Sequence, residues 1–169
     1  MLTIVSATPR QSVVNHYTPT PYDTKVTGIQ VSDLSRGAQL SLWSIRKWVQ
    51  QRQKTQRIAD TLNNAYKLAG IPEAGELVDE YLSLMGRLSM RPVTVERPCC
   101  KTVSADELLI LRTLRSLQLG HHDSAMLQIS RIISGRFRDA FCRSAKAYVE
   151  SLSSAGLSLN RISNLSIAG

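Results

Sequence analysis

The chain has 169 residues, of which 43% are hydrophobic and 20% are charged. This length allows one domain to fold without disulfides or a structural metal, and the composition excludes an intrinsically disordered chain. The net charge of +8 favours an anionic partner such as nucleic acid, acidic lipid or an acidic protein face. No apolar run approaches the ~18 residues that span a bilayer. Because aromatic residues make up only 5% of the chain, we expect an aliphatic core.

Residues 1–32 contain three prolines and six threonines without a sustained helical or alternating period. This pattern predicts a flexible N-terminal arm, in which an extended piece over 25–31 has no predicted strand to pair with. The first residues are too few and too polar for a secretory signal. Three cysteines, two of them adjacent, do not make a disulfide framework and suit a reducing compartment. We therefore expect a cytoplasmic protein.

Residues 33 to 90 show the apolar spacing of successive helices, interrupted by start and stop signals. Asp33 is the predicted N-cap of a first helix that ends near Arg52, and Thr55 is the predicted N-cap of a second. Gly70 is expected to end the second helix and Pro72 to begin the third. The predicted apolar stripes of the first and third helices are Ala38, Leu42, Ile45 and Val49, and Leu77, Tyr81, Leu84 and Leu88.

The second half of the chain contains further helix start and stop signals. Ser104 and Glu107 have the spacing of a capping box, which predicts a fourth helix that ends at Gly120 and lies centrally in the bundle. A fifth helix is expected from Asp123 to Gly135, and a sixth from about 136 to 155. The sequence therefore predicts an all-α protein, a single bundle of five to six helices over 33–156 with an irregular N-terminal arm and a C-terminal tail over 157–169.

The predicted first helix is apolar on two faces. At 100° per residue, Leu40, Trp43 and Lys47 fall on the side opposite the main stripe. Such a helix either lies inside the bundle or presents Trp43 to a partner, with the Lys47 ammonium over the ring. We predict a partner-binding surface made of Leu40, Trp43, Arg46 and Lys47. The predicted function is a small protein-interaction or regulatory module that binds another protein.

The region from 36 to 57 is basic and contains no acidic residue. An alternative function is a nucleic-acid-binding accessory protein, in which these side chains contact phosphates and Trp43 stacks on a base. No recognition-helix signature, RNA-binding motif or zinc-finger spacing accompanies them. The residues predicted for this alternative are Arg36, Arg46, Lys47, Arg52, Lys54 and Arg57.

Cys99 and Cys100 precede the capping box, at the start of a predicted helix where amide dipoles favour a thiolate. A third option is therefore a thiol or metal site at this pair. Zinc needs four ligands, and the available completions are Cys142, His121, His122 and His16. None of them has the short gap of a metal-binding motif. Since no nucleophile elbow, phosphate loop or paired-carboxylate motif is present either, we expect no catalytic activity and no cofactor.

From the first helix to Leu159 the layout resembles an uncharacterised family of short alphaproteobacterial helical proteins, a domain of unknown function. The resemblance is carried by Arg91-Pro92, the Cys99-Cys100 cluster and the helix start at Ser104–Glu107, after a leucine-rich first helix. It implies a bacterial, non-secreted protein without an assigned activity, so it implies no site residues. It also implies a role for the cysteine pair beyond packing. The first 30 residues lie outside it.

Overall fold

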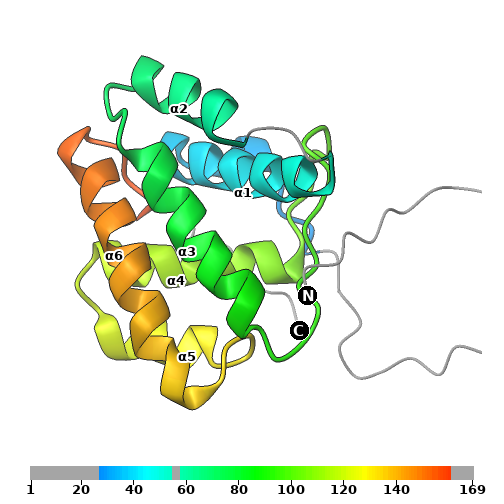
Figure 1. Cartoon of the computed structure of the whole chain (residues 1–169), viewed down its shortest axis with the longest axis vertical. Helices are drawn as coiled ribbons and strands as arrows, with labels where there is room; N and C mark the ends of the chain where they lie inside the picture. The colour runs from blue at the N-terminus through cyan, green and yellow to red at the C-terminus, as the bar shows by residue number, and fades with distance from the viewer. Residues whose placement is uncertain (1–26, 55–57, 161–169) are drawn as a thin grey trace, which may run out of the picture.

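A computed structural model describes residues 27–54 and 58–160 of the chain. These residues form six α-helices and two short 3-10 turns, with no β-strand among them, which confirms the predicted all-α bundle (Figure 1). The helices are α1 (Arg36–Lys54), α2 (Ile58–Leu68), α3 (Ala74–Leu88), α4 (Ala105–Gln118), α5 (His122–Ile129) and α6 (Arg138–Ser154), and the 3-10 turns are η1 (Val31–Asp33) and η2 (Gly135–Phe137).

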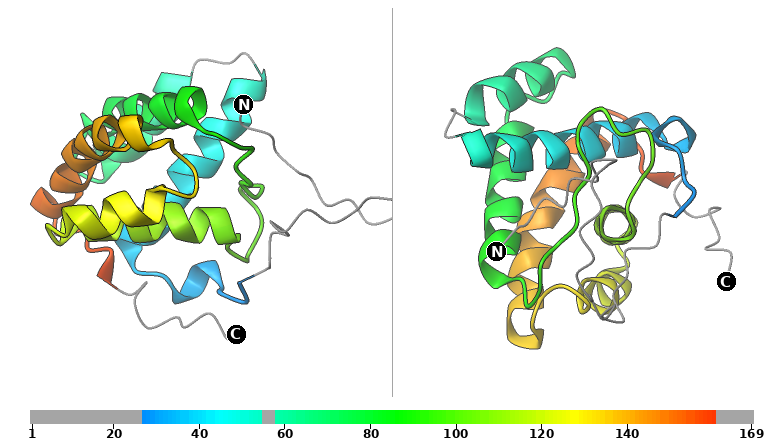
Figure 2. Two further views of the ribbon diagram at one scale, coloured as in Figure 1. Left: turned by 90° about the horizontal axis from the view of Figure 1, so that it is seen from below. Right: turned by 90° about the vertical axis from the view of Figure 1, so that its right-hand side faces the viewer.

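The helices form two layers, α3 with α6 and α4 with α5, and α1 crosses the upper part of both (Figures 1 and 2). Helix α2 packs on α1 and α3. In the described part of the chain no helix has the length and apolarity needed to cross a membrane. The buried core consists mainly of aliphatic side chains, as expected, but its largest members are aromatic: Trp48, Tyr66, Tyr81, Phe141 and Tyr148.

The local start and stop signals were predicted correctly at several points. The Ser104 hydroxyl accepts the Glu107 N–H at 3.2 Å, and the Glu107 carboxylate accepts the Ser104 N–H at 2.9 Å, so the capping box is present. Gly70 and Gly120 have φ of 80° and 77°, the left-handed backbone that ends a helix. Helix α4 is central, as expected, because nine of its residues are buried.

Two predicted N-caps are wrong. The Asp33 carboxylate accepts the Gln30 N–H at 3.1 Å and closes the 3-10 turn, whereas the Ser35 hydroxyl accepts the Ala38 N–H at the start of α1. Asp123 lies inside the first turn of α5, and this helix ends at Ile129 rather than at Gly135. The chain leaves α5 early because Ile133 pairs with Ser89 at the end of α3. The predicted Thr55 cap lies outside the described residues.

The buried face of α3 also differs from the predicted stripe. Only Tyr81 of the predicted set is fully buried, while Leu77, Leu84 and Leu88 are half-buried. Because α3 contacts α1, α2 and α6, its buried face is wider and turned from the leucine repeat. The buried residues of α3 are Ala74, Gly75, Val78, Tyr81, Leu82 and Met85.

The packed unit extends beyond the predicted bounds of 33 and 156. Ile29 and Leu159 are buried, the Val31 N–H donates to the Lys101 carbonyl at 2.7 Å, and the Val103 N–H donates to the Ile29 carbonyl at 3.0 Å. The expected extended piece therefore has a partner, the segment before α4, over the residues that the structure describes. The rest of the predicted arm, 1–26, and of the predicted tail, 161–169, lies outside the described residues.

Candidate interaction surface

Helix α1 has an inner face and an outer face, as its two apolar stripes indicated. Ala38, Leu42, Ile45 and Val49 are buried, as predicted. Leu40, Trp43 and Lys47 are half-buried, and Leu40 and Trp43 pack against the edge of the core. The exposed Arg36 lies one turn before Leu40 on the same side. We call the four residues Arg36, Leu40, Trp43 and Lys47 the α1 outer face.

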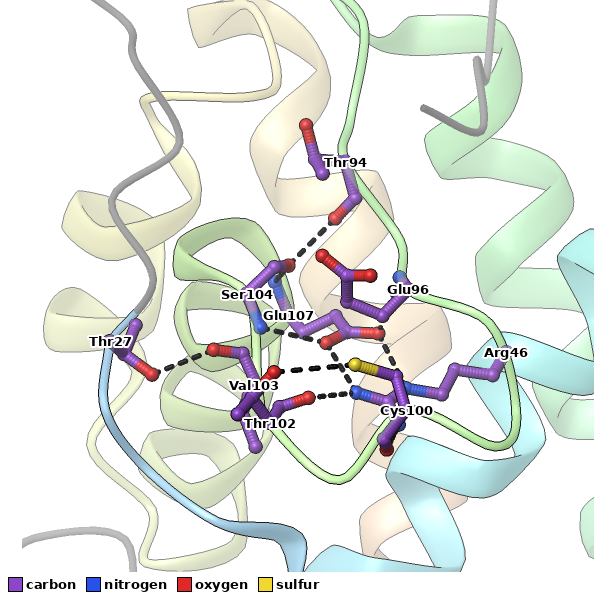
Figure 3. Close-up of polar contacts among 9 residues, drawn as sticks. All are labelled: Thr27, Arg46, Thr94, Glu96, Cys100, Thr102, Val103, Ser104 and Glu107. Atoms are coloured by element: carbon purple, nitrogen blue, oxygen red, sulfur yellow. Dashed lines mark hydrogen bonds and ion pairs between the residues drawn. The ribbon is translucent and has the colours of Figure 1, made fainter. Parts of the chain in front are cut away.

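Arg46 does not belong to this outer face, which corrects its place in both predicted sets. Its side chain is only 2% exposed and forms a bidentate ion pair with Glu107, Nε to Oε1 at 2.7 Å and Nη2 to Oε2 at 2.8 Å (Figure 3). It also donates at 2.6 Å to the carbonyls of Cys100 and Thr102. The burial of Arg46 could have been predicted from residue spacing, because position 46 comes four residues after Leu42 and three before Val49, on the buried face of the helix.

We call the Arg46–Glu107 pair the arginine clamp. Glu107 makes further hydrogen bonds within it. Its Oε1 accepts the Glu96 N–H at 3.0 Å and its Oε2 accepts the Ser104 N–H at 2.9 Å, in addition to the two guanidinium bonds (Figure 3). A carboxylate removed from water needs such partners, since its desolvation otherwise exceeds the ion-pair attraction. The clamp therefore fixes α1, α4 and the segment before α4 in one arrangement.

A second arginine fastens the other end of the same segment. Arg91 forms a bidentate pair with Asp106, at 2.6 Å and 2.9 Å, and donates from Nε to the Arg131 carbonyl at 3.0 Å. Asp106 also accepts the Thr94 N–H at 2.8 Å. The Arg91-Pro92 and Ser104–Glu107 features that carry the family resemblance thus have structural roles here.

A buried chain of hydroxyl groups supports the inner side of α1. The Ser41 hydroxyl lies 2.8 Å from the Tyr148 hydroxyl, which lies 2.9 Å from that of Tyr66, which lies 2.7 Å from that of Ser44. Burial raises the pKa of Tyr148 to about 12 and also raises the pKa of Tyr66. These groups are closed off from solvent, so their role is to hold α1, α2 and α6 together.

The cysteine pair lies in a turn beneath the clamp. Cys99 is exposed, and the half-buried Cys100 has its sulfur 3.3 Å from the Thr102 hydroxyl. Cys142 is buried in α6, which raises the pKa of its thiol to about 11. Over the described ranges no group of three or more His, Cys, Asp or Glu side chains could hold a metal ion. The exposed His121 and His122 start α5, and His16 lies outside the described residues.

The basic residues predicted for nucleic-acid binding do not share one surface. Arg36 is exposed, Arg46 is buried, and Lys47 donates to Gln50 at 3.4 Å. The Arg52 guanidinium lies 4.6 Å from the centre of the Trp48 ring and donates to the Ser83 hydroxyl at 2.8 Å. The Lys54 side chain and Arg57 lie outside the described part of the structure. What remains available beside Trp43 is Arg36 and Lys47.

One hollow of about 250 Å³ lies where the ends of α4 and α6 meet the segment after α6. Gln118 joins α4 to the segment after α6 there, because its side-chain amide donates to the Leu157 carbonyl and accepts the Leu159 N–H. Its lining has no titratable side chain, and consists of Gln118, Leu119, Ser153, Gly156, Leu157, Ser158 and Asn160.

The chain matches no protein-family model, and comparisons with curated proteins and with solved structures give no match either. The resemblance to the alphaproteobacterial family therefore stays a prediction. What the α1 outer face binds has to be inferred from its own chemistry.

Proposed function

We propose that this protein is a small, non-catalytic interaction module that binds another protein through the α1 outer face. The observation that carries the proposal is Trp43, a large aromatic side chain that packs on the edge of the core and keeps part of its surface accessible. Tryptophan is enriched among the residues that supply most of the binding energy at protein interfaces.

The rigidity of the helix supports this function. The arginine clamp and the chain of hydroxyl groups hold the inner side of α1, so its outer face needs little further ordering when it binds. Association loses free energy to the ordering of mobile side chains and segments, and a preorganised helix avoids most of that cost. A fixed helix face therefore favours binding.

Charge indicates the chemistry of the partner. Arg36 and Lys47 flank Leu40 and Trp43 on the same face, and α1 contains no acidic residue. A complementary segment would carry an apolar side chain between carboxylates, which gives both burial at the centre and charge pairing at the rim. The proposed partner is thus a protein that presents an acidic segment with apolar residues.

The test compares substitutions on the outer face with matched ones elsewhere. Trp43→Ser and Lys47→Glu are compared with Leu68→Ser and Lys67→Glu on α2, where Leu68 is 91% exposed. Partners are captured from native cells, identified, purified and titrated against each variant. We expect both outer-face variants to weaken binding by roughly tenfold or more, about 1.4 kcal/mol, while the α2 variants bind like the wild type.

Lys47→Glu keeps this test decisive if Trp43→Ser fails to fold, because the Lys47 side chain is not part of the core cluster. A purified partner that binds all four variants equally would refute the proposed surface. So would a captured partner that consists of nucleic acid alone.

The second candidate function is nucleic-acid binding by α1. One observation favours it: Trp43 lies between Arg36 and Lys47, the arrangement in which a base stacks while its phosphates are neutralised. The burial of Arg46 removes a central member of the predicted set, so we rank this function below protein binding. Titration with a mixed single-stranded oligonucleotide at low and moderate salt tests it. Binding that weakens with salt and is lost in Lys47→Glu would favour this function.

A further inference from the structure

Apart from α1, a second surface lies at the opposite end of the bundle, where α3 ends and α6 begins (Figure 1). Three contacts join the two segments there. Ser89 bridges Ile133, the Met90 N–H donates to the Ile132 carbonyl at 2.9 Å, and Arg91 Nε donates to the Arg131 carbonyl at 3.0 Å. We call the exposed residues of this region the arginine end: Arg87, Met90, Leu127, Arg131 and Arg136.

Arginine predominates in this region. Residues 82–95 and 124–138 contain five arginines and no lysine, and the acidic residues that border these ranges are Glu96, Asp123 and Asp139. Arg91 is occupied by Asp106, and Arg138 donates to the Ile133 carbonyl at 3.1 Å. Within the described ranges no carboxylate forms an ion pair with Arg87, Arg131 or Arg136. Asp139, the nearest acid in sequence, pairs with Arg143 and lies 3.4 Å from His122.

Large apolar side chains accompany these arginines. Met90 is 58% exposed and Leu127 is 74% exposed, and both belong to the short set of large hydrophobic residues that the described surface leaves exposed. Arg136 lies over the Phe137 ring, 4.5 Å from its centre. A surface that combines arginine, methionine and leucine without lysine has the composition of a protein interface, where arginine and methionine are enriched and lysine is depleted.

We propose that the arginine end is a second docking surface, which binds an acidic segment of a partner protein that also carries apolar side chains. The planar guanidinium matches a carboxylate with two parallel hydrogen bonds, and Met90 and Leu127 would cover the apolar residues of the segment. A phosphodiester backbone would use the arginines but leave both apolar side chains in water. This favours a polypeptide over nucleic acid.

The experiment uses the full chain and a short fluorescent peptide in which pairs of Glu alternate with Leu. Arg87→Gln/Arg131→Gln/Arg136→Gln is compared with Lys67→Gln/Arg97→Gln/Lys101→Gln, which removes the same charge from exposed positions outside the region. We expect the first variant to weaken peptide binding roughly tenfold or more and the matched variant less than threefold. Met90→Ser/Leu127→Ser, which leaves the charge unchanged, should also weaken binding. Unaltered melting temperatures establish that the variants fold.

Several outcomes would overturn the proposal: no saturable binding of the peptide, equal losses in the two triple variants, or tighter arginine-dependent binding of an oligonucleotide or of phosphatidylserine vesicles. Lys47→Glu separates this surface from the proposed function. Because the α1 outer face is proposed to bind a segment of the same chemistry, each variant is also titrated in the Lys47→Glu background, where the arginine end alone should bind the peptide. Peptide binding that persists in Lys47→Glu and is lost when the three arginines are also replaced supports this surface whether or not α1 binds its own partner.

Discussion

Asp106 and Glu107 are neighbours in the first turn of α4, and each holds an arginine through a bidentate ion pair. Their surroundings differ. The side chains of Arg46 and Glu107 are 2% and 0% exposed, whereas those of Arg91 and Asp106 are 22% and 7% exposed. Arg46 comes from a distant helix, and Arg91 comes from the segment that leads into α4. The same chemistry is therefore used once inside the molecule and once near its surface.

This difference decides what each pair contributes. A buried charge that loses its partner cannot return to water, so breaking the Arg46–Glu107 pair leaves a carboxylate or a guanidinium without compensation. A charge near the surface regains part of its hydration when its partner is removed. Both carboxylates also accept backbone N–H groups near the start of α4, where the helix dipole favours negative charge. The two pairs should thus differ in how much the free energy of unfolding falls when the arginine is removed.

The largest effect is expected for Arg46→Ala. Removal of this guanidinium leaves Glu107 buried and unpaired, and should lower the free energy of unfolding by about 3–5 kcal/mol. Urea denaturation of the variant and the wild type measures the change. The double variant Arg46→Met/Glu107→Leu is the control. It removes the unpaired charge and should recover part of the loss, while the Glu96 and Ser104 N–H groups and the Cys100 and Thr102 carbonyls lose their partners. A cost of less than about 1 kcal/mol would contradict the assigned burial.

Alkaline pH should act on the other buried polar cluster. Burial raises the pKa of Tyr148 from 10.0 to about 12, so above pH 10 the unfolded chain loses this proton while the folded chain keeps it. Stability is thus complete below pH 10 and falls as the pH rises toward 12, by roughly 3 kcal/mol from this group. Cys142, whose pKa is raised from 9.0 to about 11, adds a loss that begins near pH 9.

Denaturation midpoints measured from pH 8 upward check this linkage, with Tyr148→Phe and Cys142→Ala as separate controls. Each control is less stable from the outset, but its stability should fall less steeply with pH, because one group with a raised pKa is gone. If stability falls with pH as steeply in both controls as in the wild type, groups other than Tyr148 and Cys142 cause the alkaline loss of stability.

A smaller loss of stability is expected for Arg91→Ala, which tests the difference between the two arginine–carboxylate pairs directly. Asp106 keeps its bond from the Thr94 N–H and gains access to water, so the loss should be about 1–2 kcal/mol. The same urea titration measures it beside Arg46→Ala. Added salt should weaken the Arg91–Asp106 pair more than the buried pair. If the two alanine variants cost equally, burial does not distinguish the two pairs.

The parts of this fold that sequence predicts well are those with local causes. The capping box at Ser104 and Glu107 and the helix end at Gly120 depend on residues within a turn of one another, so their chemistry is visible in the sequence. Arg46 can be buried because it pairs with Glu107, 61 positions away. The sequence indicates this burial only through the position of Arg46 on the apolar face of its helix. Composition likewise shows that aromatic residues are few, but not that Tyr66, Tyr81, Phe141 and Tyr148 contact one another in the core.

The candidate site likewise has features that local sequence predicts and features that depend on distant residues. Leu40, Trp43 and Lys47 share a face because of helix periodicity, which the sequence contains. Their partial burial depends on where the rest of the bundle packs. The arginine end was not predicted as a surface, because the segment that carries Arg87 and Met90 is joined to the segment that carries Arg131 by contacts between residues 89–91 and 131–133, which the sequence does not show.

The smallest effect should come from Ser104→Ala, which leaves both arginine pairs intact and removes a hydroxyl between them. This hydroxyl accepts the Glu107 N–H at 3.2 Å and donates to the Thr94 carbonyl at 2.9 Å. Loss of an N-cap costs about 1 kcal/mol, and Ser104→Thr, which keeps the hydroxyl, should recover most of it. A loss in Ser104→Ala that exceeds that of Arg91→Ala would mean that the cap, rather than the outer ion pair, holds this segment onto α4.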